Sequence, residues 1–362
     1  MRICYVSGGT SVHDQRFLIS LAERGHEMHL VSFSRANMPS IYEKSKVYVH
    51  HTKCPIEWLN PLVPPMLNRI IHKVKPDVIH SGFLQSYGFY AALVNHHPLL
   101  SMPWGSDVLV YPKSPLYGWI TRFTLSRADM ITCDCRRMKS EILRLVDFPE
   151  VRIVVFPWGI DLAKFNPLKI DPEIREQLGW EDNLVVIHDR MFEKIYGPEY
   201  LVDAIPGIVK EIPEARFLFC GTGPLERKMK KEIARLGLSS YVHFAEFVKN
   251  EDLSKYLNSA DLYVSCSLSD GSSISLLEAM GCGLPVIVTD LPANSEWITD
   301  GRNGLVVPLR NSQVLAQKIV ELLKDTARRE QFGLRNLEIA REKIDWERNL
   351  GILEKIYEHL VG

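Results

Sequence analysis

The chain has 362 residues, of which 46% are hydrophobic and 24% charged, and its formal net charge is −1. This length predicts two domains that each bury a core, and the composition excludes a disordered or fibrous chain. Seven cysteines without a regular framework fit a reducing compartment, and no second cysteine pair completes a zinc site. The N-terminal apolar run is too short for a signal peptide, so we expect a cytoplasmic protein.

Charge is divided unevenly along the chain. Residues 1–160 carry 18 Lys/Arg against 12 Asp/Glu, and residues 161–362 carry 25 against 32. The first part is therefore the better candidate for an anionic partner, such as a phosphorylated lipid or the inner face of a membrane, which would make the protein peripheral. Nucleic acid is not expected, since no binding motif accompanies the modest excess. No transmembrane span is predicted either, because amides, histidines and prolines interrupt the uncharged segment 81–106.

The chain opens as a strand, helix, strand unit. Gly8 and Gly9 follow the first strand, where backbone can approach a ligand closely. His13 and Arg16 begin the helix; they either touch a ligand or form a solvated helix end, and the second is slightly favoured. Apolar runs predict further strands in the first half over 27–33, 47–50, 76–80, 99–102, 128–133 and 153–156.

Two segments of the first half have more than one interpretation. Residues 64–75 carry one apolar helical stripe, which packs on a core in most helices but also suits an interfacial membrane helix. Residues 111–127 mix aromatic with basic side chains, a composition typical of a membrane edge, of an acceptor-binding segment or of a half-buried surface helix.

The second half alternates strands and helices, which predicts an α/β domain. The strands are expected over 184–188, 216–220, 241–244, 262–266 and 285–288, and the helices over 200–211, 273–280, 311–324, 327–343 and 346–360. Arg190 and Lys194 follow the first of these strands, and a basic pair at that edge can neutralise a leaving diphosphate. For Lys194, a salt bridge with Glu193 or Glu199 is the competing interpretation.

Residues 261–290 form the most informative stretch, DLYVSCSLSDGSSISLLEAMGCGLPVIVTD. A strand, a small polar loop and a helix start follow one another, and such a helix start offers an anion site. Asp270 in the loop and Glu278 in the helix bracket that site, and Glu278 could accept hydrogen bonds from a ribose. A structural alternative exists, in which Ser275 and Glu278 form a capping box.

The residues DGSSISLLEAMGCGLPVI resemble the signature of the family 4 retaining glycosyltransferases, an E-x7-E pattern in which Asp270 stands in place of the first glutamate. Gly25-His26-Glu27-Met28, Gly221-Thr222-Gly223-Pro224 and the turn 301–307 are similar to further motifs of that family. The resemblance implies a GT-B architecture of two Rossmann-like domains with parallel sheets facing a central cleft. It divides the chain into an acceptor-binding domain over 1–166, a nucleotide-sugar-binding domain over 167–343 and a C-terminal helix over 344–362 that crosses back to the first domain.

The resemblance also assigns site residues. Catalytic roles fall to Asp270, Arg190 and Lys194, and Glu278 holds the nucleotide ribose. The other donor contacts are Gly8, Gly9, Gly221, Phe247, Val248, Gly271, Ser272 and Ser273, and the tentative substrate contacts are His13, Arg16, Trp104 and Asp107. Trp104 stands where relatives usually have a histidine, so no catalytic histidine is carried over, and Asp107 either binds a sugar hydroxyl or caps its loop.

The function implied is a retaining transfer from a UDP-, GDP- or ADP-linked sugar to a hydroxyl acceptor, such as a glycan, a small molecule, a lipid-linked sugar or a membrane lipid. No Asp-x-Asp pair occurs in the sequence, so we expect no metal and no other cofactor. Three alternatives stay open: a sugar-nucleotide epimerase of the same fold, a degenerate relative that binds a sugar nucleotide or a partner without turnover, and a glycan-binding protein.

Overall fold

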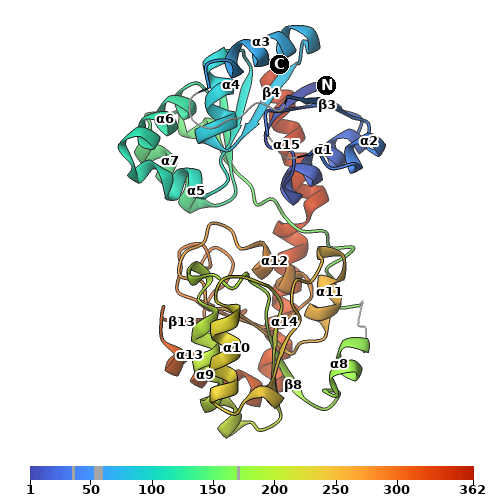
Figure 1. Ribbon diagram of the computed structural model, residues 1–362, viewed down its shortest axis with the longest axis vertical. Coiled ribbons are helices and arrows are strands. Elements are labelled where there is room, and N and C mark those ends of the chain that lie inside the picture. Colours follow the sequence, from blue (N-terminus) through green and yellow to red (C-terminus); the bar gives the residue numbers. More distant parts are fainter. Residues whose placement is uncertain (35–36, 53–59, 169–171) are drawn as a thin grey trace. The chain divides into compact units, whose positions relative to one another are not determined.

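The computed structural model describes residues 1–34, 37–52, 60–168 and 172–362. Its chain divides into two compact units (Figure 1): unit 1 holds residues 1–157 and 350–362, and unit 2 holds residues 158–349. Each unit has one sheet whose described strands all pair in parallel, with helices between them. The α/β class predicted from the sequence is thus confirmed. The assignment of 1–166 to the acceptor and 167–343 to the donor stays a prediction.

The sheet of unit 1 has seven strands in the order β3-β2-β1-β4-β5-β6-β7. They are β1 Arg2–Val6, β2 Glu27–Ser32, β3 Val47–His51, β4 Val78–Gly82, β5 Leu99–Met102, β6 Met130–Cys133 and β7 Ile153–Val155. The helices are α1 Val12–Glu23, α2 Ile41–Lys44, α3 Val63–Val74, η1 Leu84–Gly88, α4 Phe89–Val94, α5 Ser106–Leu109, η2 Tyr111–Lys113, α6 Pro115–Ser126, α7 Arg136–Leu145 and η3 Glu150–Arg152. The strand order reverses between β1 and β4, and ligands of such sheets bind outside the carboxyl ends of the strands at that point.

The apolar stripe of α3 packs on the core of unit 1. Leu67 and Ile71 are fully buried and Val74 nearly so, while Met66 and Ile70 pack partly buried against the same cluster. Each buried aliphatic side chain contributes about 2 kcal/mol. The structure therefore favours the core interpretation of this stripe, and a membrane contact of α3 stays a prediction.

The sheet of unit 2 has six strands in the order β10-β9-β8-β11-β12-β13. They are β8 Leu184–His188, β9 Ala215–Phe219, β10 Val242–Phe244, β11 Leu262–Ser265, β12 Val286–Thr289 and β13 Leu305–Val307. The helices are α8 Glu173–Leu178, η4 Lys194–Tyr196, α9 Pro198–Glu211, α10 Glu226–Arg235, η5 Ser239–Tyr241, α11 Asn250–Asn258, α12 Ile274–Gly281, α13 Ser312–Lys324, α14 Thr326–Ile339 and η6 Ala340–Ile344. The predicted helix over 327–343 is thus an α-helix that ends in a π-helical turn. The strand order reverses between β8 and β11.

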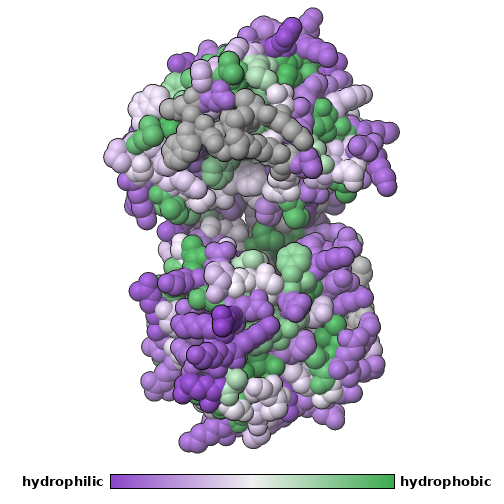
Figure 2. Space-filling view, in the orientation of Figure 1, coloured by the Kyte–Doolittle hydropathy of each residue, from purple (hydrophilic) through white to green (hydrophobic). Residues whose placement is uncertain are grey.

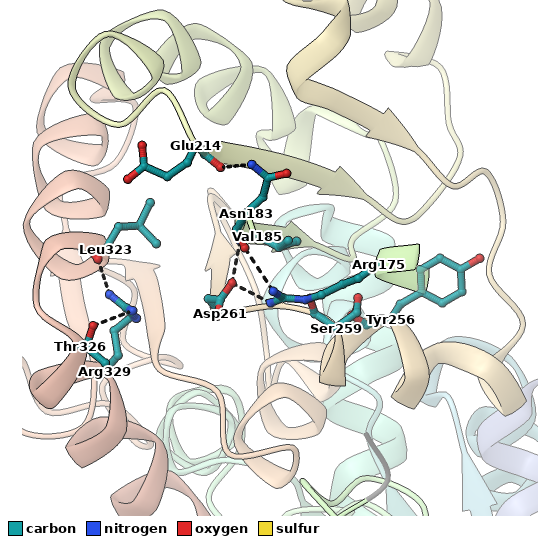
Figure 3. Close-up of polar contacts among 10 residues, drawn as sticks. All are labelled: Arg175, Asn183, Val185, Glu214, Tyr256, Ser259, Asp261, Leu323, Thr326 and Arg329. Carbon is teal, nitrogen blue, oxygen red and sulfur yellow. Dashed lines mark hydrogen bonds and ion pairs between the residues drawn. The ribbon is translucent and has the colours of Figure 1, made fainter. Parts of the chain in front are cut away.

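An arginine fastens α8 to the amino ends of β8 and β11 (Figure 3). The guanidinium of Arg175 donates to the carbonyl oxygens of Asn183 and Ser259 and, at 2.7 Å, to the carboxylate of Asp261. The same carboxylate oxygen accepts the N–H of Val185 at 2.8 Å. These bonds stabilise the edge of the sheet at which the strands begin. They do not reach the opposite edge, at which ligands of such sheets bind.

The last helix, α15 Trp346–Val361, begins in unit 2, and its residues from Leu350 onward belong to unit 1. Within unit 1, Glu354 pairs with Arg24 at 2.5 Å and with His26 at 3.0 Å. The hydroxyl of Tyr357 lies 2.6 Å from Nδ1 of the buried His80. Among the residues that the structure describes, no helix is long and apolar enough to cross a membrane.

Candidate functional site

The candidate site of unit 2 lies at the carboxyl ends of β8 and β11. Arg190 follows β8 by two residues, and the polar loop 266–273 follows β11 and leads into α12. Because parallel strands end at a common edge, residues that are 80 positions apart in the sequence meet here.

Arg190 is the centre of this edge. Its Nη1 donates to Oγ of Ser273 at 2.6 Å, and its Nη2 donates to Oδ2 of Asp270 at 2.7 Å. The guanidinium also stacks over the ring of Tyr196, with 4.1 Å between its central carbon and the ring centroid. The side chains of Arg190 and Asp270 are only 10% and 13% exposed. Three groups from two other segments thus fix one cation at the edge of the sheet.

Burial alone lowers the pKa of Arg190, but the neighbouring groups, led by the carboxylate of Asp270, raise it more in total. The pKa of this side chain therefore lies above its ordinary value. The guanidinium keeps its charge at every physiological pH and can serve as a permanent counter-ion.

Ser273, and not Ser275, begins α12. Oγ of Ser273 accepts the N–H of Leu276, whereas Glu278 lies in the second turn and is 6% exposed. The capping-box alternative is therefore wrong. One of the contacts of Glu278 is a long one, 3.5 Å from Oε1 to the side-chain amide of Asn250. Since the buried carboxylate of Glu278 does not cap α12, helix initiation does not explain why a glutamate occupies this position.

A glycine loop packs against Arg190 from the side of β9. A side chain on Gly221 would come within 2.6 Å of the carbonyl oxygen of Arg190, and its φ of +151° also favours glycine. The N–H of Gly221 donates to the carbonyl of Glu246 at 2.8 Å, next to Phe247 and Val248. Phe247 is 67% exposed. The structure thus brings the predicted base-contacting residues to the same edge as Arg190.

Lys194 is exposed and lies in the turn η4, which packs on the loop after β11. The carbonyl of Ile195 accepts the N–H of Leu268 at 2.8 Å. The ion pairs found among the described residues do not include one between Lys194 and either Glu193 or Glu199. In the neighbouring loop, Oγ of Ser272 is buried without a hydrogen-bond partner in the described part of the chain.

Asp189 lies directly behind Arg190. Both of its carboxylate oxygens are buried and lack a close hydrogen bond to the described residues, although the hydroxyl groups of Tyr263 and Ser275 lie near enough to act on its charge. Burial raises the pKa of Asp189 to about 6, against the opposing effect of Arg190. Asp189, Tyr196 and Asn250 were missed from the sequence. Only Asp189 carried a signal there, because it adjoins Arg190 at the end of a strand.

The corresponding edge of unit 1 contains the two N-terminal glycines. The N–H of Gly9 donates to Oδ2 of Asp14 at 3.0 Å and to Oγ of Ser7 at 3.1 Å. The buried Asp14 also accepts the hydroxyl of Ser7 at 2.7 Å. The amide of Gly9 is thus engaged within the protein, which leaves Gly8 as the stronger candidate for a phosphate contact in this loop.

Asp107 has the contacts of a loop cap. Its two oxygens accept the N–H groups of Leu84, Trp104 and Gly105 at 2.9–3.2 Å, and it is fully buried. Burial raises its pKa to about 6. The structure therefore favours the capping alternative for Asp107, and a sugar contact stays a prediction.

His13 and Trp104 come together at this edge, with their ring centroids 6.1 Å apart in an edge-to-face arrangement. Burial, together with the charge of Arg16, lowers the pKa of His13 to about 4, so its imidazole is neutral at physiological pH. Since Asp107 accepts the N–H of Trp104, all four tentative substrate residues lie close together. Among the described residues, no group of three His, Cys, Asp or Glu side chains could hold a metal ion.

Two family models match this sequence, "Glycosyltransferase Family 4" over residues 7–164 and "Glycosyl transferases group 1" over residues 170–337. Together they cover most of the chain. N-acetyl-alpha-D-glucosaminyl L-malate synthase of Bacillus anthracis is 25% identical, over 98% of this chain and 95% of that protein. Spore coat protein SA of Bacillus subtilis is 29% identical over 55% of this chain, and the match spans only 57% of that protein.

The fold is that of a solved GT-B enzyme. The structure of Anabaena Alr3699/HepE in complex with UDP superposes with a TM-score of 0.84 at 21% identity, covering 99% of both chains. The two parallel-sheet units therefore define a GT-B protein. The chain belongs to the glycosyltransferase family that the two models describe, and the resemblance read from residues 270–287 is confirmed.

Proposed function

We propose that this glycosyltransferase moves a sugar from a nucleotide-diphosphate sugar to a hydroxyl acceptor with retention of configuration, and without a metal. The observation that carries the proposal is the anchored Arg190 beside the start of α12. A fixed cation next to the N-terminus of a helix is a site for a diphosphate.

The donor is bound by unit 2 in this proposal. Arg190 and the first turn of α12, with the amides of Gly271, Ser272 and Ser273, hold the diphosphate. Glu278 accepts two hydroxyl hydrogen bonds from the ribose, and its burial in the second turn of α12 supports that role. Backbone groups at Phe247 and Val248, beside Gly221, meet the base. Gly8, in unit 1, stays a predicted phosphate contact.

The proposed reaction depends on stabilising the negative charge of the leaving diphosphate. As the glycosidic bond breaks, negative charge grows on the diphosphate, and Arg190 with the exposed Lys194 stabilises it. The acceptor hydroxyl enters on the face from which the diphosphate leaves and gives its proton to a phosphate oxygen, so configuration is retained. No protein base is needed, which suits a chain with Trp104 where relatives have a histidine. Asp270 both orients Arg190 and faces the donor sugar.

The acceptor is met by unit 1, through the cluster of His13, Arg16 and Trp104. The basic balance of the first 160 residues supports an acceptor on a lipid or a lipid-linked glycan, handled by a cytoplasmic enzyme that is peripheral to the membrane. UDP-sugars are the first donors to test, because Anabaena Alr3699/HepE was also solved with UDP-glucose.

Binding of UDP-, GDP- and ADP-sugars is measured as a thermal shift, with and without EDTA, on the wild type and on Glu278→Gln and Arg190→Ala. A ligand at a hundredfold excess over its Kd stabilises the protein by about 2.7 kcal/mol. We expect one nucleotide class to raise the Tm of the wild type in the presence of EDTA, and both variants to lose that shift while their own melting stays cooperative.

The absence of a shift with every nucleotide sugar would remove the donor site as proposed. Turnover is tested separately, by following nucleotide diphosphate release and the anomeric configuration of the product. Release that depends on an added acceptor identifies a transferase, whereas release without any acceptor would favour the sugar-nucleotide epimerase.

A further inference from the structure

Helix α6 of unit 1 leaves part of its apolar surface uncovered. Its inward face carries Ile120 and Leu125 together with Gly118, Thr121 and Thr124, all buried, while Leu116 and Trp119 point outward and are 46% and 55% exposed. A helix that serves only to cover a core places its large apolar residues inward, so the core does not account for this outward pair.

The outward position of Leu116 and Trp119 follows from the packing of α6. A side chain on Gly118 would lie 2.8 Å from the carbonyl of Pro112, so only glycine fits at this contact. The hydroxyl of Thr121 donates to the carbonyl of Tyr117 at 2.7 Å, and that of Thr124 donates to the carbonyl of Leu84 at 3.2 Å. The inward face has therefore neither the room nor the polarity for the indole of Trp119.

The preceding turn η2 extends the exposed apolar surface. Val110 just before it is 49% exposed and Tyr111 is 37% exposed. With Leu116 and Trp119 they form what we call the α6 face. Figure 2 shows hydrophobic and weakly polar side chains at the surface of unit 1 on the side where α6 lies in Figure 1, whereas hydrophilic side chains gather over α9 and α10 of unit 2.

Cations surround the α6 face. Lys113, Arg122 and Arg127 are exposed, and no Asp or Glu occurs in residues 108–128. The ion pairs found among the described residues do not include any of the three. Arg127 donates to the side-chain oxygen of Asn95 and lies over the ring of Phe123, neither of which is an anionic group.

The charge of the neighbouring elements has the same sign. Described residues 60–128 contain two acids, Asp77 and Asp107. The first accepts the N–H of Arg2, and the second is fully buried beneath its ring of backbone N–H groups. The exposed side of α3 adds Arg69 and Lys73. An anionic partner would thus meet almost no opposing charge here.

We propose that the α6 face docks on an anionic membrane surface. Its outward indole and leucine side chains enter the interfacial region, where tryptophan is enriched, and the surrounding cations contact lipid phosphates. A lipid surface fits the α6 face better than an acidic protein does. The reason is that the apolar side chains project from one helix and its preceding turn and are surrounded by cations. The inference deepens the proposed function and rests on its lipid-borne acceptor, since such an acceptor requires the enzyme at the membrane.

Sedimentation with vesicles tests the proposal on the whole chain. Vesicles of phosphatidylcholine alone are compared with vesicles that also contain phosphatidylglycerol. We expect binding to the anionic vesicles, weakened by added salt. The double variant Lys113→Glu and Arg122→Glu should bind them at least about tenfold more weakly, because each cation near the surface contributes about 1 kcal/mol, or about fivefold. Trp119→Ser should weaken binding about fivefold.

The matched control is Arg227→Glu with Lys231→Glu, which makes the same change of charge on two exposed residues of α10 in unit 2. It should bind within about twofold of the wild type. Failure of the wild type to bind either vesicle, equal binding to both, or equal losses in the control would overturn the proposal. The proposal would also be overturned if the chain bound an acidic protein but neither kind of vesicle. Nucleotide-sugar thermal shifts on the same samples report the donor site independently, so a failure of docking is distinguishable from a failure of the proposed function.

Discussion

The two units use their buried carboxylates differently. In unit 1, Asp14 and Asp107 accept backbone N–H groups and shape the loops that follow β1 and β5. In unit 2, Asp270 meets the guanidinium of Arg190 and Glu278 has a long contact with the side-chain amide of Asn250. Asp14 and Asp107 thus accept backbone N–H groups, Asp14 together with the hydroxyl of Ser7, whereas Asp270 and Glu278 contact other side chains.

This difference separates two ways of preparing a sheet edge for ligands. A carboxylate that accepts backbone N–H groups withdraws those donors from any bound anion, as Asp14 does with Gly9. An acid that pairs with an arginine fixes the position of the cation and withdraws no backbone N–H group. This contrast is one reason for proposing that unit 2 binds the diphosphate. The comparison predicts that substitutions at the two edges impair different properties.

The largest expected effect is that of Arg190→Ala on turnover. Loss of a preorganised cation that stabilises the leaving diphosphate should lower kcat/KM by about 10³-fold, or about 4 kcal/mol. Steady-state kinetics with the donor identified by thermal shift measures it.

The matched control for that variant is Arg175→Ala, which also breaks an arginine–aspartate pair but at the opposite edge of the sheet. It should lower the Tm and leave kcat/KM within a few fold. Equal kinetic losses in the two variants would contradict a special role for Arg190.

Much of this contrast is invisible in the sequence. The strands and most helices could be predicted to within a few residues, because hydrophobic periodicity decides them locally. The Arg190–Asp270 pair could not, since it joins residues 80 positions apart. The motif order brought both residues to one edge but said nothing of their mutual contact.

Other misses have specific physical causes. The capping-box alternative put the cap at Ser275 because its spacing to Glu278 is right, whereas the cap is Ser273, two residues earlier. The outward position of Trp119 on α6 was also hidden. The aromatic residues of this helix are spaced at helical intervals, and only packing decides that Trp119 faces outward while Thr121 and Thr124 face inward.

The comparison is tested next in unit 1, by Asp107→Ala. This change leaves the N–H groups of Leu84, Trp104 and Gly105 without their acceptor in a buried site. Hydrogen bonds to a charged group contribute about 1.5–3 kcal/mol, so the free energy of unfolding should fall by about 3 kcal/mol. Urea denaturation measures it. A normal stability combined with lost turnover would instead favour the sugar contact.

An effect of similar size is expected from Asp189→Asn in unit 2, and it depends on pH. The pKa of Asp189 is raised to about 6 in the folded chain, mainly by burial. The folded chain then binds a proton that the unfolded chain lacks between about pH 4 and pH 6. This group therefore lowers the free energy of unfolding as pH rises through that window, by about 3 kcal/mol.

Asn cannot titrate, so the free energy of unfolding of the variant should lack this part of the pH dependence. Relative to the wild type, the variant should therefore be more stable at pH 7 than it is at pH 4. Unfolding midpoints in urea at pH 4, 5, 6 and 7 provide the curve for both proteins. Parallel curves would mean that Asp189 titrates normally and is better solvated than its burial indicates.

The smallest effect is expected from Tyr357→Phe. This variant tests whether the neutral buried pair of Tyr357 and His80 has only a structural role, like the buried carboxylates of unit 1. The hydroxyl of Tyr357 lies 2.6 Å from Nδ1 of His80, and burial lowers the pKa of that histidine to about 3, so the pair is uncharged at neutral pH. Loss of one neutral hydrogen bond should lower the free energy of unfolding by about 1 kcal/mol, measured by urea denaturation. The dependence of that free energy on pH should not change above pH 5. Since the pair lies within unit 1, Arg190-dependent donor binding should stay the same. A donor affinity that falls with this variant would show that the edge of unit 2 depends on how α15 is held, and the separation of roles between the two units would no longer stand.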